Sequence, residues 1–237
     1  MSGHLNPGGQ QFRDDNGAAD PRVTAALAAY YAGQGSEQDA LTALAAARLL
    51  VPVVAVPADD STVRAAEGDK NSQMVLPTLI GRDGRPAVLA FTGLDTLARW
   101  RPNARPVPAE SDRVWRAAVA DGCAVVIDVA GPVPVAVEGT RLAALAAGQP
   151  APAAYEDGDV RAEVEAAIAA EPVIAGVSMA PSHQLDLAVR LHLSADSWAS
   201  GDWQPAVNHV AQSIAARLAG RLRRGVEVSV TRDPLGS

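Results

Sequence analysis

Cysteine and histidine are the side chains best suited to nucleophilic or metal chemistry, and this chain has few of them. The single cysteine, Cys123, follows a glycine and opens the apolar run Cys123–Asp128. A catalytic thiol needs a base or a cationic environment that lowers its pKa, and no histidine lies near Cys123 in the sequence. Because free cysteine is among the most buried residue types, we interpret Cys123 as a core residue, with a nucleophile as the alternative.

The four histidines do not show the spacing of a metal site. They are His4, His183, His192 and His209, and none of them forms an HxxxH or HExxH pattern. Two histidines could still meet across a sheet and bind zinc, but such a site needs third and fourth ligands. We therefore expect histidines that face solvent or accept ordinary hydrogen bonds, and we predict no metal.

Motifs for phosphate binding and for acid–base catalysis are also absent from the sequence. No GxGxxG follows an apolar run, no GxxxxGK[ST] occurs, and Ser178 and Ser182 lack the GxSxG elbow. The paired carboxylates fall in polar stretches, where a solvated role is the simpler interpretation; they are Asp59-Asp60, Glu156-Asp157 and Glu163 with Glu165. With no nucleophile–base pair in view, the sequence favours a protein that is not an enzyme and binds no cofactor.

Four arginines near the C-terminus form the one basic cluster. They are Arg217, Arg221, Arg223 and Arg224. One interpretation is an anion or RNA contact. The other is a set of cations at the negative end of a helix dipole, each favourable by about 0.3–1 kcal/mol. The chain has 20 basic and 27 acidic residues, a net charge of -7, which disfavours binding to nucleic acid or anionic lipid.

Two short segments have the composition of an interaction surface. One is a charged turn that contains Arg82, Asp83 and Arg85, and the other is the proline-rich segment 100–108, with Trp100, Arg101 and Arg105. Tryptophan and arginine are enriched at protein interfaces. The alternative for the second segment is a buried Trp100 with prolines that only order a crossover. We expect these prolines to prevent a regular backbone ladder.

Helical and strand patterns alternate along the chain and predict an α+β protein. Asp83-Gly84 is typical of a hairpin turn between the strands Met74–Ile80 and Ala87–Phe91. Pro52 and Pro57 suggest that Leu49–Val56 begins or edges a sheet rather than lying at its centre. Amphipathic helices between the strands imply helices packed on a sheet, and a long helix is predicted over Pro205–Arg223.

Composition divides the chain into two small domains, each with a mixed or antiparallel sheet and packed helices. Residues 1–19 are polar and glycine-rich, which predicts a disordered tail. A first domain is predicted over 20–148 and a second over 160–232. Between them, residues 149–159 combine proline with an acidic cluster, as linkers often do.

The sequence also favours a cytoplasmic location. A single cysteine excludes an intramolecular disulfide, the N-terminus lacks a cationic start followed by an apolar run, and the apolar runs are short. We therefore expect no membrane association.

The stretch VLPTLIGRDGRPAVLAFTGLDTLARW resembles the N-terminal domain of the SseB-like family of bacterial proteins. It combines two strands, the second ending in Phe91-Thr92, with a short helix that contains Leu97 and ends at Trp100. The resemblance covers roughly Ala25 to Leu145, and Val160 to Thr231 is similar to the C-terminal domain that often accompanies it. It implies a cytosolic bacterial accessory protein of two α+β domains, and it carries no catalytic residues.

From these observations we predict a non-enzymatic accessory or regulatory module that binds an unknown protein partner. The predicted contacts are the Arg82–Arg85 turn and the Trp100–Pro108 segment. The alternative is a small-molecule-binding protein or enzyme whose site lies in the cleft between the domains.

Overall fold

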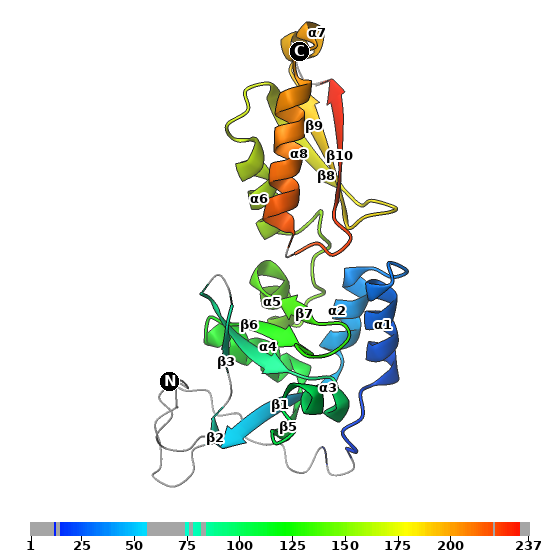
Figure 1. The fold of residues 1–237 in the computed structure, drawn as a ribbon, viewed down its shortest axis with the longest axis vertical. Coiled ribbons are helices and arrows are strands. Elements are labelled where there is room, and N and C mark those ends of the chain that lie inside the picture. Colours follow the sequence, from blue (N-terminus) through cyan, green and yellow to red (C-terminus); the bar gives the residue numbers. More distant parts are fainter. Residues whose placement is uncertain are drawn as a thin grey trace. The chain divides into compact units, whose positions relative to one another are not determined.

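The computed structural model describes Phe12 and residues 15–55, 74–75, 78–81, 84–219 and 221–232. The fold is α+β, and its contacts divide the chain into two compact units, Met1–Ala151 and Pro152–Ser237 (Figure 1). The division falls within the stretch where the sequence predicts a linker, and the first helix of the second unit begins at Gly158. Each unit is described below by itself.

The N-terminal unit contains five described helices and seven described strands. In chain order they are α1 (Pro21–Tyr31), α2 (Glu37–Ala45), β1 (Arg48–Ala55), β2 (Met74–Val75), β3 (Thr78–Ile80), β4 (Pro86–Ala90), α3 (Leu94–Trp100), β5 (Arg105–Glu110), α4 (Ser111–Ala120), β6 (Ala124–Ile127), β7 (Val135–Val137) and α5 (Gly139–Ala146).

These strands form two sheets, which a single bridge joins. One sheet has the order β2-β1-β5, and the other has the order β3-β4-β6-β7. The bridge connects Leu50 of β1 to Phe91, just after β4. Within the second sheet β4 and β6 run parallel, while the β3–β4 and β6–β7 pairs are antiparallel. The parallel pair therefore brings the carboxyl ends of β4 and β6 to the same edge.

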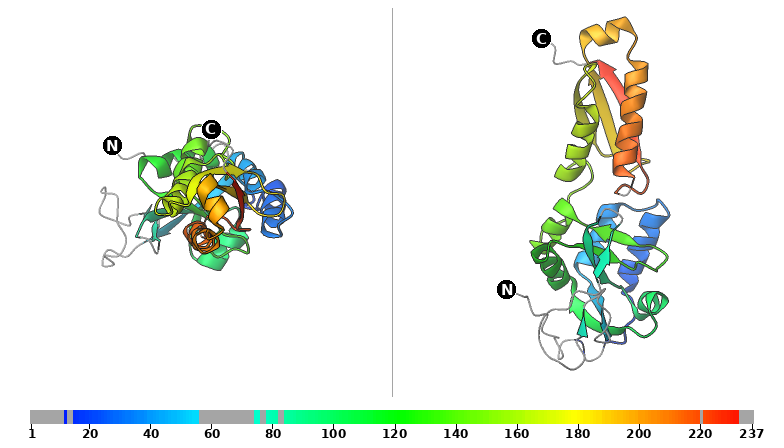
Figure 2. Two further views of the ribbon diagram at one scale, coloured as in Figure 1. Left: turned by 90° about the horizontal axis from the view of Figure 1, so that it is seen from above. Right: turned by 60° about the vertical axis from the view of Figure 1, so that its left-hand side comes forward.

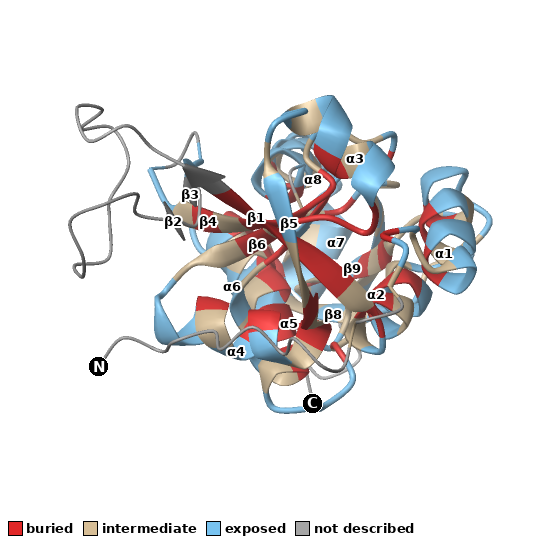
Figure 3. Cartoon of the chain, turned by 90° about the horizontal axis from the view of Figure 1, so that it is seen from below, coloured by how far each residue is buried: buried red, intermediate tan, exposed pale blue. Residues whose placement is uncertain are grey.

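Helices cover these sheets with narrow apolar stripes. In α1 the buried residues are Val23, Leu27 and Tyr30, a spacing that places them on one face; Figure 3 shows this buried strip on an otherwise exposed helix. In α4 the large buried side chain is Trp115, which is 1% exposed. The core is therefore built mainly from aliphatic side chains around one tryptophan.

The proline-rich segment forms a regular strand, which corrects the prediction that it could not. Strand β5 pairs with β1 over six positions, and Pro106 lies opposite Pro52. Proline cannot donate a ladder bond, so this must be a non-hydrogen-bonded pair of the antiparallel ladder. Likewise Leu50 lies opposite Pro108 but makes its two backbone hydrogen bonds with Phe91, each 2.8 Å long. The prolines thus occupy alternate positions, where the β1–β5 ladder needs no donor from them.

The same register corrects the prediction that Leu49–Val56 is an edge or the start of a strand. Strand β1 lies between β2 and β5, and Leu49, Leu50 and Val51 are all buried. Pro52 lies between the Leu50–Phe91 bridge and the Val54–Val75 pair. Proline is tolerated in this central strand because no neighbouring strand needs a backbone N–H at that position.

The predicted strand Met74–Ile80 is divided into two. Strand β2 pairs with β1, whereas β3 pairs with β4 and forms the predicted hairpin. In the turn of this hairpin Gly84 has φ +79°, a backbone conformation that glycine adopts without strain.

Residues 15–19 are ordered against the N-terminal unit, which corrects part of the predicted disordered tail; most of the remaining tail lies outside the described residues. The guanidinium of Arg48 makes an ion pair of 2.6 Å with Asp15 and donates to the backbone oxygens of Ala18 and Thr92 at 2.5 and 3.1 Å. In addition, the backbone N–H of Leu94 donates a hydrogen bond of 2.8 Å to the carbonyl oxygen of Gly17. A charge-assisted anchor therefore holds a segment that has little apolar surface of its own.

The C-terminal unit consists of one three-stranded sheet with helices on one face (Figures 1 and 2). Its elements are α6 (Gly158–Ile168), β8 (Ile174–Ala180), β9 (Leu187–Leu193), α7 (Ala195–Ser200), α8 (Gln204–Leu218) and β10 (Val226–Arg232). The order is β10-β9-β8, with β10 parallel and β8 antiparallel to β9. Alternate residues of β9, from Leu187 to Leu193, are buried against α6 and α8. The short helix α7 was not predicted.

Two of the four C-terminal arginines, Arg217 and Arg221, pair with carboxylates of their own unit, and α8 ends before three of the four. Helix α8 stops at Leu218 rather than at Arg223, so only Arg217 lies in its last turn, where a cation can favour the helix dipole. Arg221 makes ion pairs of 3.0 Å with Asp157 and 2.9 Å with Asp159, and Arg217 pairs with Glu163 at 2.9 Å. Arg224 donates from its backbone to Asp186 and from its side chain to the carbonyl of Gln184.

We predict that Arg221→Ala destabilises the C-terminal unit by about 3 kcal/mol, because it leaves the Asp157 carboxylate buried without its cation. The side chains of Arg221 and Asp157 are only 15% and 1% exposed. Hydrogen exchange of the β9 amides in the full chain measures the change. The matched control is Arg217→Ala, whose pair is 43% and 44% exposed, and which should cost no more than about 1 kcal/mol. Equal effects of the two substitutions would contradict the prediction.

Candidate functional site

The carboxyl ends of β4 and β6 carry polar side chains that meet at one edge of the sheet. Thr92 follows β4 by two residues, and Asp128 comes directly after β6. Ala90 and Ile127 are register partners in the parallel pair, so the residues that follow them emerge side by side. In open sheets with parallel strands, ligands commonly bind at this edge.

Asp128 is a buried carboxylate with three hydrogen-bond donors, and it is only 3% exposed. One oxygen accepts from the Thr92 backbone N–H at 2.9 Å and from Thr96 Oγ1 at 2.5 Å. The other accepts from Thr92 Oγ1 at 2.6 Å. Because each donor lies at or near the start of α3, Asp128 fixes that helix to the end of β6.

The backbone around Asp128 is held in an uncommon conformation. Asp128 has φ +49°, and it is the one non-glycine residue with positive φ in the part of the chain that the structure describes. Aspartate tolerates this left-handed region better than most residues. Two neighbouring glycines allow close packing: a Cβ on Gly131 would lie 2.9 Å from the Asp128 Cβ, and one on Gly93 would lie 2.9 Å from the Ala19 nitrogen.

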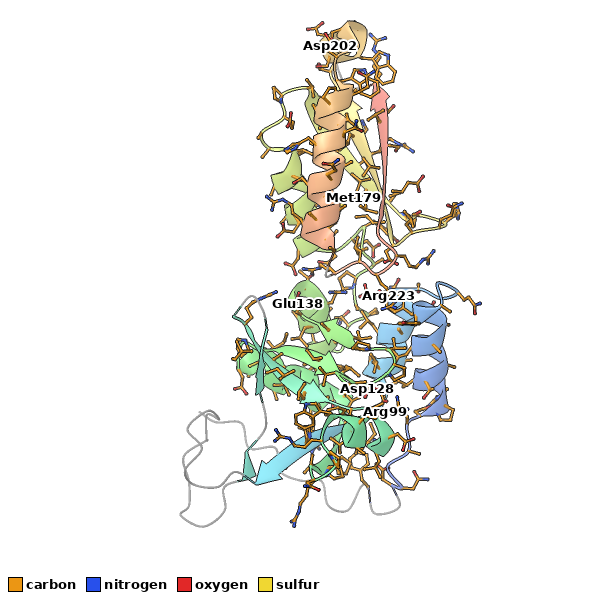
Figure 4. The ribbon with its side chains drawn as sticks, viewed as in Figure 1. Arg99, Asp128, Glu138, Met179, Asp202 and Arg223 are labelled. Carbon is orange, nitrogen blue, oxygen red and sulfur yellow. The ribbon has the colours of Figure 1, made fainter. Side chains whose placement is uncertain are left out.

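A cavity of about 490 Å³ opens beside this network, a size that suits a small molecule. Helix α1, the ordered segment before it, the start of α3 and the loop after β6 supply its walls. The lining residues are Asn16, Gly17, Ala18, Ala19, Thr24, Leu27, Ala28, Thr92, Gly93, Leu94, Asp95, Thr96, Arg99, Asp128, Pro132 and Val133. Figure 4 labels Asp128 and Arg99 in this part of the unit.

The cavity has the chemistry of a binding site more than that of a catalytic one. Both oxygens of Asp128 already accept bonds from threonines, so this carboxylate is occupied in positioning α3. Arg99 and Asp95 also line the cavity and make no side-chain hydrogen bond or ion pair with any described residue. They can therefore contact the polar group of a ligand whose apolar part rests on Leu27 and Val133.

Sequence reasoning missed Asp128, Thr96 and Arg99 as site residues. A signal was present, because Asp128 ends the apolar run of β6 and Thr92 follows the apolar run of β4. Its meaning depends on the parallel pairing of β4 with β6. Along the chain α3, β5 and α4 separate these two strands, so no local pattern reveals that they are neighbours.

The structure separates the two halves of the predicted interaction surface. Arg82 and Asp83 lie outside the described residues. Arg85 is exposed just before β4 and pairs with Glu138 at 3.0 Å. Trp100 instead contacts Phe91, just after β4, with ring centroids 5.5 Å apart. Arg85 and Trp100 therefore lie near opposite ends of β4, the first just before this strand and the second against the residue that follows it.

Trp100 is half-buried, an outcome between the two alternatives considered from the sequence. Its inner side packs on the cluster of Leu50, Leu89, Phe91 and Leu97. The guanidinium of Arg101 lies 5.1 Å from the centre of its ring, and both Arg101 and Arg105 are exposed.

Cys123 is half-buried, and its environment does not activate it. Its Sγ lies 3.5 Å from the Asp121 carbonyl oxygen, to which the thiol donates. Burial, and secondarily the charge of Asp121, raise the pKa of the Cys123 thiol above its ordinary value. A raised pKa leaves less of the reactive thiolate at neutral pH.

One hydroxyl–imidazole pair occurs where the sequence showed no nucleophile–base pair. Ser178 Oγ lies 2.9 Å from His192 Nε2, across the β8–β9 ladder. The pair lies on the sheet face opposite the buried β9 residues. Neither residue lines the cavity beside Asp128. No three potential metal ligands gather among the described residues.

No helix within the described ranges combines the length and apolar character needed to cross a bilayer.

We predict that Asp128→Ala destabilises the N-terminal unit by about 3 kcal/mol or more, because buried donors lose a charged acceptor and alanine is strained at positive φ. Asp128→Asn should cost less, since asparagine keeps the shape and tolerates this φ. Chemical denaturation of the two variants measures the difference. Asp112→Ala, which breaks an exposed pair with Arg116, is the control. A cost for Asp128→Ala no larger than that of the control would contradict the assigned role.

Comparison with known proteins identifies the family through the N-terminal unit. No curated protein and no solved structure matches the chain. The model of the SseB protein N-terminal domain matches residues 23–144, more than half of the chain, and this range includes β4, α3 and β6 with Asp128. The similarity of Val160–Thr231 to a C-terminal SseB domain stays a prediction. The chain belongs to the SseB family.

Proposed function

We propose that this chain is a non-enzymatic accessory or regulatory protein of the bacterial cytoplasm that acts by binding another protein. The observation that carries the proposal is the half-buried Trp100, with Phe91 behind it and the Arg101 guanidinium stacked on its ring. Tryptophan and arginine supply much of the binding energy at protein interfaces.

The surroundings of Trp100 favour a rigid contact surface. Its inner side rests on a buried cluster, so little side-chain freedom would be lost on binding. The segment then turns into β5, an edge strand whose outer side has no described partner. Arg105, at the start of β5, is exposed and supplies a second cation five residues after Trp100 in the chain. We define the Trp100 surface as Trp100, Arg101 and Arg105.

The turn at Arg82, Asp83 and Arg85 is proposed as a separate contact. The ion pair of Arg85 with Glu138 has side chains that are 63% and 25% exposed. Such a pair contributes little stability, so a partner carboxylate could take the place of Glu138 at small cost.

The double substitution Arg101→Ala/Arg105→Ala tests the Trp100 surface without removing buried atoms. We expect the variant to fold normally and to lose about ten-fold or more in affinity for a partner captured by the wild-type chain. Capture from bacterial extract identifies the partner, and titration of the purified pair measures the affinity. Arg113→Ala/Arg116→Ala on α4 is the matched control, because it removes the same number of exposed arginines elsewhere on the unit.

Unchanged affinity in the Arg101/Arg105 variant would remove the Trp100 surface from the proposal. Equal losses in both double variants would show a general charge effect rather than a defined contact.

A second candidate function is binding of a small molecule, favoured by the 490 Å³ cavity beside Asp128. The sequence alternative placed such a site in a cleft between domains, whereas this cavity lies within the N-terminal unit. Its apolar walls, with Arg99 and Asp95 available for polar contacts, suit an amphipathic ligand.

We predict that Ala28→Trp abolishes binding of small aromatic fragments at this cavity, because the new ring would occupy the space beside Leu27. Ala28 is exposed at the cavity wall, so the fold should tolerate the change. Ligand-observed NMR with charged and neutral fragments measures binding to the full chain. The control is Ala120→Trp at the end of α4, also exposed. Fragments that bind both variants equally would argue against the cavity as a site.

A further inference from the structure

Helix α7 lies at the end of the C-terminal unit and contributes nothing to its core. It has six residues, from Ala195 to Ser200, and none of them is buried. It follows β9 directly, and β9 runs parallel to β10, so α7 lies beyond the carboxyl end of that strand pair (Figure 1). Hydrophobic burial therefore does not account for this element.

Local capping holds α7 in place instead. The Ser194 hydroxyl accepts from the Ser197 backbone N–H at 3.2 Å, and Gly201 ends the helix with φ +76°. These are the cap residues expected at the two ends of a helix. The short helix is consequently preorganised although its side chains face solvent.

Two of the four tryptophans of the chain meet at this helix. Trp198 of α7 stacks on Trp203, with ring centroids 5.8 Å apart and planes inclined by 10°. Trp203 also packs against the core of the unit, whereas Trp198 is 40% exposed. An indole fixed on one side and exposed on the other is a typical interface anchor. We call residues 194–203 the tryptophan cap.

The charge on the tryptophan cap is negative. Asp196 and Asp202 are exposed, and their carboxylates bind no other described residue; Figure 4 labels Asp202 at this end of the unit. From Ser194 to Ala216 the sequence has no lysine or arginine. One cation, Arg232, lies near the base of α7, where it is paired in register with Leu193. The two carboxylates therefore outnumber the nearby cation.

We propose that the tryptophan cap docks an arginine-bearing segment of a partner protein. A guanidinium stacks on the exposed face of Trp198. The carboxylates of Asp196 and Asp202 accept hydrogen bonds from its N–H groups or from those of a neighbouring basic residue. Arginine fits better than lysine because its planar group stacks on an indole and hydrogen-bonds in its own plane at the same time. The chain already uses this contact internally, between Arg101 and Trp100.

Titration of the full chain with three labelled peptides, GRGRG, GKGKG and GEGEG, tests the proposal by fluorescence anisotropy. We expect the arginine peptide to bind most tightly, the glutamate peptide not to bind, and added salt to weaken the binding. Trp198→Ala should weaken arginine-peptide binding by about ten-fold, and Asp196→Asn/Asp202→Asn should weaken it several-fold. Both variants should remain folded, because α7 has no buried residue. Loss of the Trp198–Trp203 stacking should lower the unfolding temperature only slightly.

Two controls separate this site from other surfaces. Tyr31→Ala removes an aromatic that is 51% exposed on α1 and should leave peptide binding unchanged. The Arg101→Ala/Arg105→Ala variant should also bind normally, so failure of the proposed Trp100 surface leaves this test intact.

Absence of arginine-peptide binding would overturn the proposal, as would equal binding by the wild type and the Trp198→Ala variant. A wild-type dimer that dissociates when Trp198 is replaced would also overturn it, since the occupant would then be a second copy of the chain.

Discussion

The buried carboxylate of Asp128 is the interaction on which the N-terminal unit most depends. It accepts bonds from the Thr92 backbone, the Thr92 hydroxyl and the Thr96 hydroxyl, and so joins β6 to the start of α3. Because α3 ends at Trp100, the same bonds set the position of the indole. The cavity and the Trp100 surface therefore share one buried anchor, although they involve different side chains.

A second anchor extends this arrangement to the N-terminal segment. Arg48 at the start of β1 binds Asp15 and two backbone carbonyls, one of them that of Thr92. The segment that precedes α1 is thereby fixed against the loop that Asp128 also binds. Arg48 and Asp128 each bind backbone groups as well as side chains. These bonds hold the short segment before α1 in place, so it can line the cavity although it has little apolar surface.

The C-terminal unit uses charge in a comparable way, while its aromatic residues are arranged differently. Asp157 at the start of α6 is buried and pairs with Arg221 beyond α8, which ties together two helices on the same face of one sheet. The N-terminal unit buries Trp115 and half-buries Trp100. The C-terminal unit instead leaves Trp198 on a helix with no buried residue. The inner face of Trp198 stacks on Trp203, and its exposed face is the one to which the proposed arginine contact is assigned.

The sequence alone determined the α+β class, the β3–β4 hairpin and most helices, because these follow from side-chain periodicity and turn residues close together in the chain. The family resemblance over the N-terminal unit also came from contiguous residues. Tertiary structure decided what depends on pairing between distant segments. Pro52 lies in a central strand only because Pro106 and Pro108 take alternate positions opposite β1. Asp128 and Thr92 meet only because β4 and β6 are parallel neighbours. In each case the contact joins residues far apart in the chain, so the sequence around either residue does not identify its partner.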